Sequence, residues 1–238
     1  MSGHSKWAKI HRGKAVEDAK RGAVFTRLGN AIAIAAKHGA DPDMNFALRL
    51  AIDKAKALNM PASNIQRAID RGSGKLGGEQ ILEVMYEGYG PGGVGILVEC
   101  ATDNTNRTYT FVRTAFAKNG GNIAEKGAVA FMFNHMGVIR IKGALDEDLL
   151  LEIIDIGAKD TIEEEGETAI YTDSKELAIV RDKIQELNLE IIEAELTYVP
   201  KSNVAISDEV MQGKVIKLID ALEDLDDVVA THTNFEIE

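Results

Sequence analysis

The chain has 238 residues, which predicts two or three domains, and it carries a net charge of −11. Its apolar fraction of 45% is ordinary for a globular protein. Its longest apolar stretches, 31–36 and 94–98, are far shorter than the roughly 20 residues that a membrane-spanning helix needs. The amino terminus lacks the apolar core of a secretory signal, and the single cysteine, Cys100, cannot form an internal disulfide. We therefore expect a cytoplasmic protein rather than a membrane protein or a disulfide-stabilised secreted domain.

The charge is divided unevenly along the chain. Residues 1–75 carry 14 Lys and Arg against 6 Asp and Glu, a net charge of +8, whereas residues 76–238 carry 13 against 32, a net charge of −19. This asymmetry predicts a segment that binds a polyanion, joined to segments that avoid one. Because the Debye length is about 8 Å at physiological salt, the basic segment need not feel a distant acidic domain. The acidic overall charge therefore does not exclude nucleic acid as a partner.

The basic part of the chain is predicted to be helical after a short arm. Residues 1–14 contain few apolar residues, so we expect an arm that is mobile or weakly ordered. The apolar residues that follow recur at helical steps up to Gly39, which supplies a stop. A second helix is predicted to begin near Asp41–Pro42, where Asp can cap and Pro fits the first turn. A third is predicted to open at Pro61 and to end before Gly72, which completes a small three-helix bundle.

The glycine-rich segment 72–78 predicts an interdomain linker, and beyond it the hydrophobic period changes from helical to alternating. The strands predicted from the alternating pattern are 82–87, 93–101, 129–133, 138–142, 161–165, 169–172, 189–199 and 228–237. The helices predicted among them are 106–118, 147–157, 175–187 and 208–225.

The order of these elements predicts an inserted domain. Residues 138–199 follow the order β-α-β-β-α-β, which is that of a ferredoxin-like unit. The elements before them lack a second helix and a last strand, which residues 208–237 supply. We therefore predict an α+β protein of three domains. They are a basic three-helix domain with its arm (1–78), a discontinuous middle α/β-sheet domain (79–135 and 204–238) and a ferredoxin-like domain inserted in it (136–203).

Several motifs resemble catalytic or ligand-binding sites but lack what the chemistry needs. A strand follows the glycine-rich segment Gly88–Gly95, so no helix N-terminus faces that loop, and a strand-to-strand turn is favoured. Gly74-Lys75 is followed by Leu76, where a P-loop needs Ser or Thr. The five scattered histidines and the acidic run 163–167 lack the spacing of zinc or calcium ligands. We therefore predict no catalytic residue, no metal site, no cofactor and no small-molecule substrate.

Two further features have simple structural interpretations. The polar segment 103–108 lies where a predicted strand meets a helix, and Asp103, Asn104 or Thr105 can cap that helix, which stabilises by about 1 kcal/mol. Contact with a ligand is the alternative for this segment. Cys100 lies in an apolar run, which predicts a buried structural thiol rather than a reactive one.

The basic cluster is the strongest candidate for a functional site. Few acids balance it, and it includes Trp7, an aromatic residue that can stack on an unpaired base for about 1–3 kcal/mol. The predicted nucleic-acid-binding residues are Lys6, Trp7, Lys9, Arg12, Lys14, Lys20, Arg21, Arg27, Lys54 and Lys56. The remaining members of the cluster are Lys37, Arg67, Arg71 and Lys75. The alternative is a solvated helical surface without a ligand.

Several motifs together resemble the YebC/PmpR family, over essentially the whole chain. They are Met1-Ser2-Gly3-His4-Ser5-Lys6-Trp7, Asp18-Ala19-Lys20-Arg21-Gly22, Leu48-Arg49-Leu50-Ala51-Ile52-Asp53-Lys54-Ala55-Lys56, Tyr86-Glu87-Gly88-Tyr89-Gly90-Pro91-Gly92-Gly93 and Asn119-Gly120-Gly121-Asn122. The resemblance implies a three-domain cytoplasmic protein, without enzymatic activity, described as a probable transcriptional regulator that binds DNA. It also implies a competing role, because family members, including mitochondrial translational activators, are connected with the ribosome and with relief of stalling at proline runs.

We therefore expect a nucleic-acid-binding regulator of gene expression, with DNA-binding transcriptional regulation as the main hypothesis. A ribosome-associated translation factor is the alternative, since ribosomal RNA and DNA present the same charge. A third hypothesis is an adaptor that acts through its acidic domains without nucleic acid. We expect a monomer without membrane contact, because the sequence has no coiled-coil seam and no conspicuous exposed apolar stripe.

Overall fold

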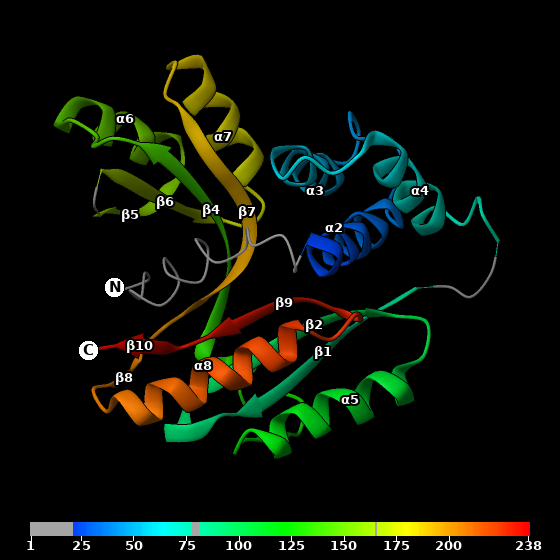
Figure 1. The fold of residues 1–238 in the computed structure, drawn as a ribbon. Coiled ribbons are helices and arrows are strands. Elements are labelled where there is room, and N and C mark those ends of the chain that lie inside the picture. Colours follow the sequence, from blue (N-terminus) through cyan, green and yellow to red (C-terminus); the bar gives the residue numbers. More distant parts are fainter. Residues whose placement is uncertain (1–20, 78–80, 165) are drawn as a thin grey trace. The chain divides into compact units, whose positions relative to one another are not determined.

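The computed structural model describes residues 21–77, 81–164 and 166–238, which form two compact units (Figure 1). The first unit contains the described residues up to Phe133 together with Pro200–Glu238, and the second is the intervening segment Asn134–Val199. The arm predicted over residues 1–14 lies outside the described part of the chain. Among the residues that the structure describes, no helix is long and apolar enough to cross a membrane. Each unit combines helices with a sheet, which confirms the α+β class.

Three helices open the first unit: α2 (Arg21–Ala36), α3 (Phe46–Ala57) and α4 (Ala62–Gly72). Their apolar faces meet in one core, as the helical spacing of the sequence predicts. Buried members of this core include Leu28, Ile32, Leu48, Ile52, Ile65 and Ile69. The predicted three-helix bundle is therefore confirmed.

The predicted start of the second helix is wrong by about one turn. α3 begins at Phe46 rather than near Asp41–Pro42. The side chain of Asn45 caps the helix by accepting a hydrogen bond from the Leu48 amide at 3.1 Å. Asp41 instead accepts from the amide of Asp43 at 3.0 Å, which stabilises a turn before the helix. Both residues can cap, and the later one does.

The predicted end of the third helix is also displaced. Gly72 is the last residue of α4 rather than a stop beyond it. It lies directly against α2, because a methyl group in place of its hydrogen would overlap the backbone carbonyl of Ala33. The missing side chain thus allows α2 and α4 to approach closely.

An antiparallel sheet forms the centre of the first unit, in the order β3-β1-β2-β9. Its strands are β1 (Leu82–Tyr89), β2 (Gly95–Thr102), β3 (Asn122–Ala124) and β9 (Val228–Thr233). Two helices, α5 (Thr105–Lys118) and α8 (Glu209–Glu223), cover one face of this sheet, and α2 lies on the other (Figure 1). The alternation along β2 accounts for both faces, since Val98 and Cys100 pack in the core with the two helices whereas Ala101 packs with Ala33 of α2.

The turn between β1 and β2 confirms the prediction for the glycine-rich segment. A short 3-10 helix, η3 (Pro91–Gly93), links the strands, and Gly92 and Gly93 have φ of 73° and 77°. Such positive values favour glycine. The segment is therefore a strand-to-strand turn and not a loop that opens a helix.

The strand predicted over Val129–Phe133 is wrong. A 3-10 helix, η4 (Ala130–Met132), occupies most of this segment. The buried carboxylate of Glu87, on β1, accepts hydrogen bonds from the amides of Gly127 at 2.6 Å, Val129 at 2.7 Å and Ala130 at 2.8 Å. These amides therefore point to a side chain instead of a neighbouring strand.

The last predicted strand is broken in two. Asn234 separates β9 from β10 (Phe235–Ile237), because its side chain accepts from the Gly95 amide at 2.8 Å and its carbonyl accepts from the Val204 amide at 2.7 Å. β10 pairs in parallel with β8 (Val204–Ile206). The sequence predicts neither β8 nor β3, and each has only three residues.

The second unit has the element order and strand order of a ferredoxin-like fold, as predicted. Its sheet runs β5-β6-β4-β7, and β6 pairs antiparallel with both β4 and β5. The elements are β4 (Phe133–Lys142), α6 (Glu147–Ile156), β5 (Ala158–Glu164), β6 (Glu167–Asp173), α7 (Leu177–Glu186) and β7 (Ile191–Pro200). Isoleucine side chains from three of these elements, Ile139, Ile153 and Ile170, are fully buried.

Candidate nucleic-acid interface

Only part of the predicted binding site falls on described residues. Six of the ten predicted side chains belong to residues 1–20, outside the described part of the chain: Lys6, Trp7, Lys9, Arg12, Lys14 and Lys20. Arg21 begins α2. The structure therefore gives the side-chain surroundings of Arg27, Lys54 and Lys56 only, and the ten-residue site as a whole stays a prediction.

Arg27 contributes to the packing of the first unit. Its guanidinium donates from Nη1 to Oε2 of Glu223, the last residue of α8, at 3.0 Å. The hydroxyl of Thr231 donates to the other carboxylate oxygen of Glu223 at 2.7 Å. Arg27 therefore joins α2 to the end of α8, a role that the charge pattern of the sequence does not reveal.

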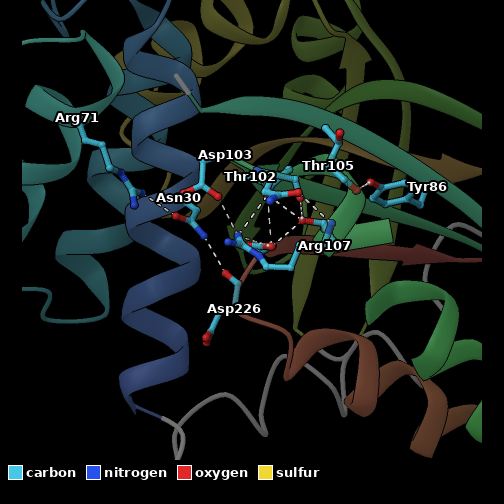
Figure 2. A network of polar contacts seen from close by, with 11 residues as sticks. Asn30, Arg71, Tyr86, Thr102, Asp103, Thr105, Arg107 and Asp226 are labelled. Carbon is cyan, nitrogen blue, oxygen red and sulfur yellow. Dashed lines mark hydrogen bonds and ion pairs between the residues drawn. The ribbon is translucent and has the colours of Figure 1, made fainter. Parts of the chain in front are cut away.

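Two more members of the basic cluster also bind within the first unit. Lys37 donates from Nζ to the carbonyl of Ile81 at 2.7 Å, next to the start of β1. Arg71 donates to Oδ1 of Asn30 at 2.6 Å, and Asn30 in turn donates to the carbonyl of Asp226 at 2.8 Å (Figure 2). Partial burial lowers the pKa of Arg71, and the nearby charge of Asp103 opposes that effect. Asn30 thus joins the helical bundle to the loop before β9, and Lys37 joins it to the start of β1.

Three other cations of α3 and α4 are on the surface. Lys54 and Lys56 are exposed in the last turn of α3, where positive charge also complements the carboxyl end of the helix dipole. Arg67 is exposed on α4. Lys56 and Arg67 form no ion pair within the described part of the chain. We name Lys54, Lys56 and Arg67 the α3–α4 cations.

The polar segment 103–108 caps α5, which confirms the structural interpretation of these residues. The side chain of Asn104 accepts from the amide of Arg107 at 3.1 Å. Arg107 donates to Asp103 at 2.9 Å (Figure 2). It also donates to both carboxylate oxygens of Asp227, at 3.0 and 3.1 Å. The hydrogen bond to Asp227 is the main cause of the raised pKa of Arg107. Thr108 donates to the same aspartate at 2.6 Å, so Asp227 organises the start of the helix.

The described residues offer little for catalysis by a thiol or a metal. Cys100 is 1% exposed, and burial raises its pKa to about 12, as the prediction of a structural thiol requires. Within the described ranges, no group of three or more His, Cys, Asp or Glu side chains could hold a metal ion.

Two family models match the chain. The model described as "TACO1/YebC protein N-terminal domain" matches residues 5–75, and the one described as "TACO1/YebC second and third domain" matches residues 81–235. The chain belongs to the TACO1/YebC family.

Curated members of the TACO1/YebC family align with the whole chain. A protein of Trichormus variabilis is 48% identical over 242 residues, and one of Persephonella marina is 49% identical over 241 residues. Each alignment covers all of this chain and 96% of the relative, and both relatives are named "Probable transcriptional regulatory protein". These names describe regulators and not enzymes.

A solved structure shares the fold. The crystal structure of a conserved hypothetical protein from Aquifex aeolicus superposes with a TM-score of 0.84 at 45% identity, covering 94% of each chain. The arrangement of helices and sheets described above therefore also occurs in a crystal structure of a similar protein.

Proposed function

We propose that this protein is a DNA-binding regulator of gene expression that acts as a non-enzymatic monomer in the cytoplasm. The main observation in favour is that the α3–α4 cations lie exposed on the bundle, whereas Arg27, Lys37 and Arg71 bind oxygen atoms within the first unit. The preceding residues 1–20 add five Lys and Arg against two Asp and Glu. The names of the family members agree with a regulatory role.

Phosphate neutralisation supplies the affinity in this proposal. Each Lys or Arg that neutralises a phosphate releases counterions, so five or six such contacts give a slope of log K against log salt of roughly −5 on duplex DNA, about −0.9 per contact. This energy does not depend on base sequence. Any preference for a promoter requires contacts to base edges or sensitivity to DNA shape.

The distribution of acidic residues supports different binding partners for the two units. Of the 27 Lys and Arg and the 38 Asp and Glu in the chain, residues 134–199 hold 6 and 17. The second unit therefore carries a net charge of −11, and the rest of the chain is neutral overall. We propose that the first unit binds DNA and that the second, which phosphates repel, binds a protein partner.

The decisive experiment measures binding of the full chain to a promoter duplex and to a scrambled duplex at several salt concentrations. Reversing the charges of Lys54 and Lys56 to Glu is expected to weaken binding at least tenfold and to flatten the salt dependence by about 1.8 in slope, about 0.9 per contact. The matched control reverses Lys142 and Lys175 in the second unit and is expected to bind normally. Equal affinity of both double variants would contradict the proposal.

A second measurement separates the two nucleic acids. Crosslinking in cells followed by sequencing of the recovered nucleic acid is expected to yield chromosomal DNA. Recovery of ribosomal RNA instead would reject DNA as the target and would favour a ribosome-associated translation factor.

A further inference from the structure

The solvent-facing side of α5 differs from the acidic remainder of the chain. The helix contains Arg107, Arg113 and Lys118 but no Asp or Glu, although residues 76–238 carry 32 acids against 13 basic residues. Arg107 is held by Asp103 and Asp227. Arg113 and Lys118 are exposed and form no ion pair with any residue that the structure describes. The outer side of α5 therefore presents two cations without a matching acid.

Two aromatic side chains flank these cations. Tyr109 is 43% exposed and Phe111 is 50% exposed, so about half of each ring is open to solvent. At 100° per residue, Tyr109 and Arg113 share one edge of the exposed side of α5, whereas Phe111 and Lys118 share the other. Each edge thus combines one ring with one cation.

Local contacts orient the Tyr109 edge. The ring of Tyr109 lies 6.0 Å from that of Tyr86, between centroids. The Tyr86 hydroxyl donates to the carbonyl of Thr105 at 3.1 Å (Figure 2). The hydroxyls of Thr110 and Thr114 donate to carbonyls one turn earlier in the helix. These short side chains therefore lie close to the helix and leave space between the larger side chains. The ring of Tyr86 thus contacts one side of the Tyr109 ring, while much of the Tyr109 ring stays open to solvent.

The shape of this side suits an elongated ligand. An open depression of about 330 Å³ runs along the helix, and its lining residues all belong to α5: Tyr109, Thr110, Arg113, Thr114, Ala117 and Lys118. A depression lined by one helix cannot enclose a small molecule as a cleft does. A chain lying in the depression can reach both cations and the Tyr109 ring, and Phe111 lies outside this lining on the edge that it shares with Lys118.

We propose that the exposed side of α5 binds a single strand of nucleic acid, with Arg113 and Lys118 at phosphates and with Tyr109 and Phe111 stacked on unpaired bases. Cations that follow the backbone and aromatic rings that stack on bases are the two components of single-strand binding. An acidic peptide satisfies the cations alone, so the exposed rings favour nucleic acid. This surface lies on the opposite face of the sheet from α2 and does not depend on the α3–α4 cations.

Fluorescence anisotropy with the full chain tests this proposal. The probes are oligo(dT), oligo(U) and a mixed-sequence duplex of the same length. Replacing Tyr109 and Phe111 by Ala is expected to weaken single-strand binding about tenfold for each ring and to leave duplex binding unchanged. Reversing Arg113 and Lys118 to Glu is expected to weaken single-strand binding and to reduce its salt slope by about 0.7 per contact.

Controls separate binding from folding. Ile179→Ala removes an exposed apolar side chain from the second unit and is expected to bind both probes normally. Phe111→Ala alone preserves the contact between Tyr86 and Tyr109 and is expected to give about half of the double variant's logarithmic loss. Thermal unfolding of each variant is expected to match that of the unmodified protein.

Three outcomes would overturn the proposal. The first is full single-strand affinity after loss of both rings. The second is an equal loss of single-strand and duplex binding, because stacking requires unpaired bases. The third is binding of an oligoglutamate peptide that needs Arg113 and Lys118 while single-strand affinity is insensitive to the rings, which would indicate an acidic protein partner.

The same probes distinguish this inference from the proposed DNA-binding function. Reversal of Lys54 and Lys56 is expected to reduce duplex binding and to leave the effect of the Tyr109 and Phe111 substitutions intact. A protein that binds no duplex but binds single strands through α5 would reject the proposed function alone. Normal duplex binding, together with single-strand binding that does not depend on Tyr109 and Phe111, would reject the α5 inference alone.

Discussion

Arg27 on α2 and Glu223 at the end of α8 form an ion pair at 3.0 Å across 196 positions of the sequence. Both side chains are largely buried, at 22% and 13% exposure, so the pair is shielded from solvent more than a surface salt bridge is. This contact joins the helical bundle to the helical layer on the other face of the sheet. Its energy is open to direct measurement.

Arg27→Gln is expected to lower the free energy of unfolding by about 1–2 kcal/mol, because Glu223 then keeps its burial but loses its cation. A double-mutant cycle with Glu223→Gln, followed by urea unfolding, is expected to give a coupling energy of about 1 kcal/mol. Lys75→Gln is the control, since Lys75 and Asp70 are 3.8 Å apart and Lys75 is exposed. Strictly additive effects of the two substitutions would show that the pair contributes nothing.

Gly72→Ala is expected to destabilise the first unit by about 1–3 kcal/mol, because the added methyl group overlaps the backbone of Ala33 and forces α2 and α4 apart. Gly213, inside α8, has no atom within 4 Å of the equivalent methyl position. Gly213→Ala is therefore expected to stabilise by about 0.5–1 kcal/mol through helix propensity. Thermal unfolding should shift in opposite directions for the two variants, and an equal shift of both would refute the close approach at Gly72.

Because of Glu87, the free energy of unfolding is expected to depend on pH in the acid range. Burial alone raises the pKa of Glu87, but the amides of Gly127, Val129 and Ala130 outweigh it, and the net pKa is lowered. Because the pKa of Glu87 is lower in the folded protein, its carboxylate stabilises the fold fully above the pKa of the unfolded state, about 4.3. This stabilisation is lost as the pH falls toward the pKa of the folded state.

Glu87→Gln is therefore expected to cost about 2 kcal/mol at pH 7, because the amide group brings donors toward three backbone donors. Urea unfolding from pH 7 to pH 3 should show the gap between the two proteins narrowing only below about pH 4.3. Glu83→Gln, at an exposed position of the same strand, is the control and should follow the unmodified protein throughout. A gap that does not change with pH would contradict the role of the Glu87 charge.

Cys100 is expected to resist thiol reagents in the native protein. A pKa of about 12 leaves roughly a thousandfold less thiolate at pH 8 than an ordinary cysteine has, and the side chain is also buried. Reaction with Ellman's reagent should therefore be slow in buffer and fast in denaturant, so that labelling reports unfolding. Rapid stoichiometric reaction of the native protein would show that the thiol is accessible.

The sequence predicts the elements whose periodic pattern is long enough to average out local exceptions. The bundle core around Ile32, Leu48 and Ile65 follows from helical spacing, and the ferredoxin-like unit follows from element order. β3 and β8 are missed because three residues contain no measurable period. The segment Val129–Phe133 reads as a strand because its side chains are apolar, although its amides bind the carboxylate of Glu87.

The candidate site is harder to predict because charge in a sequence does not reveal its partner. Arg27, Lys37 and Arg71 look like phosphate ligands in the basic cluster, yet each binds an oxygen of the first unit that lies at least 41 positions away. Lys56 and Arg67 have the same local character and stay on the surface. Only the long-range packing of the fold separates the two groups.

The second unit is inserted at a point where the two ends of the first unit's chain lie close together. The amide of Lys201 donates to the carbonyl of Met132 at 2.8 Å, so the chain departs and returns at neighbouring points. The entropy of closing a loop grows only with the logarithm of its length. The second unit can therefore change in length or charge during evolution at little cost to the stability of the first unit. We expect related proteins to diverge in the part of the chain beyond this junction.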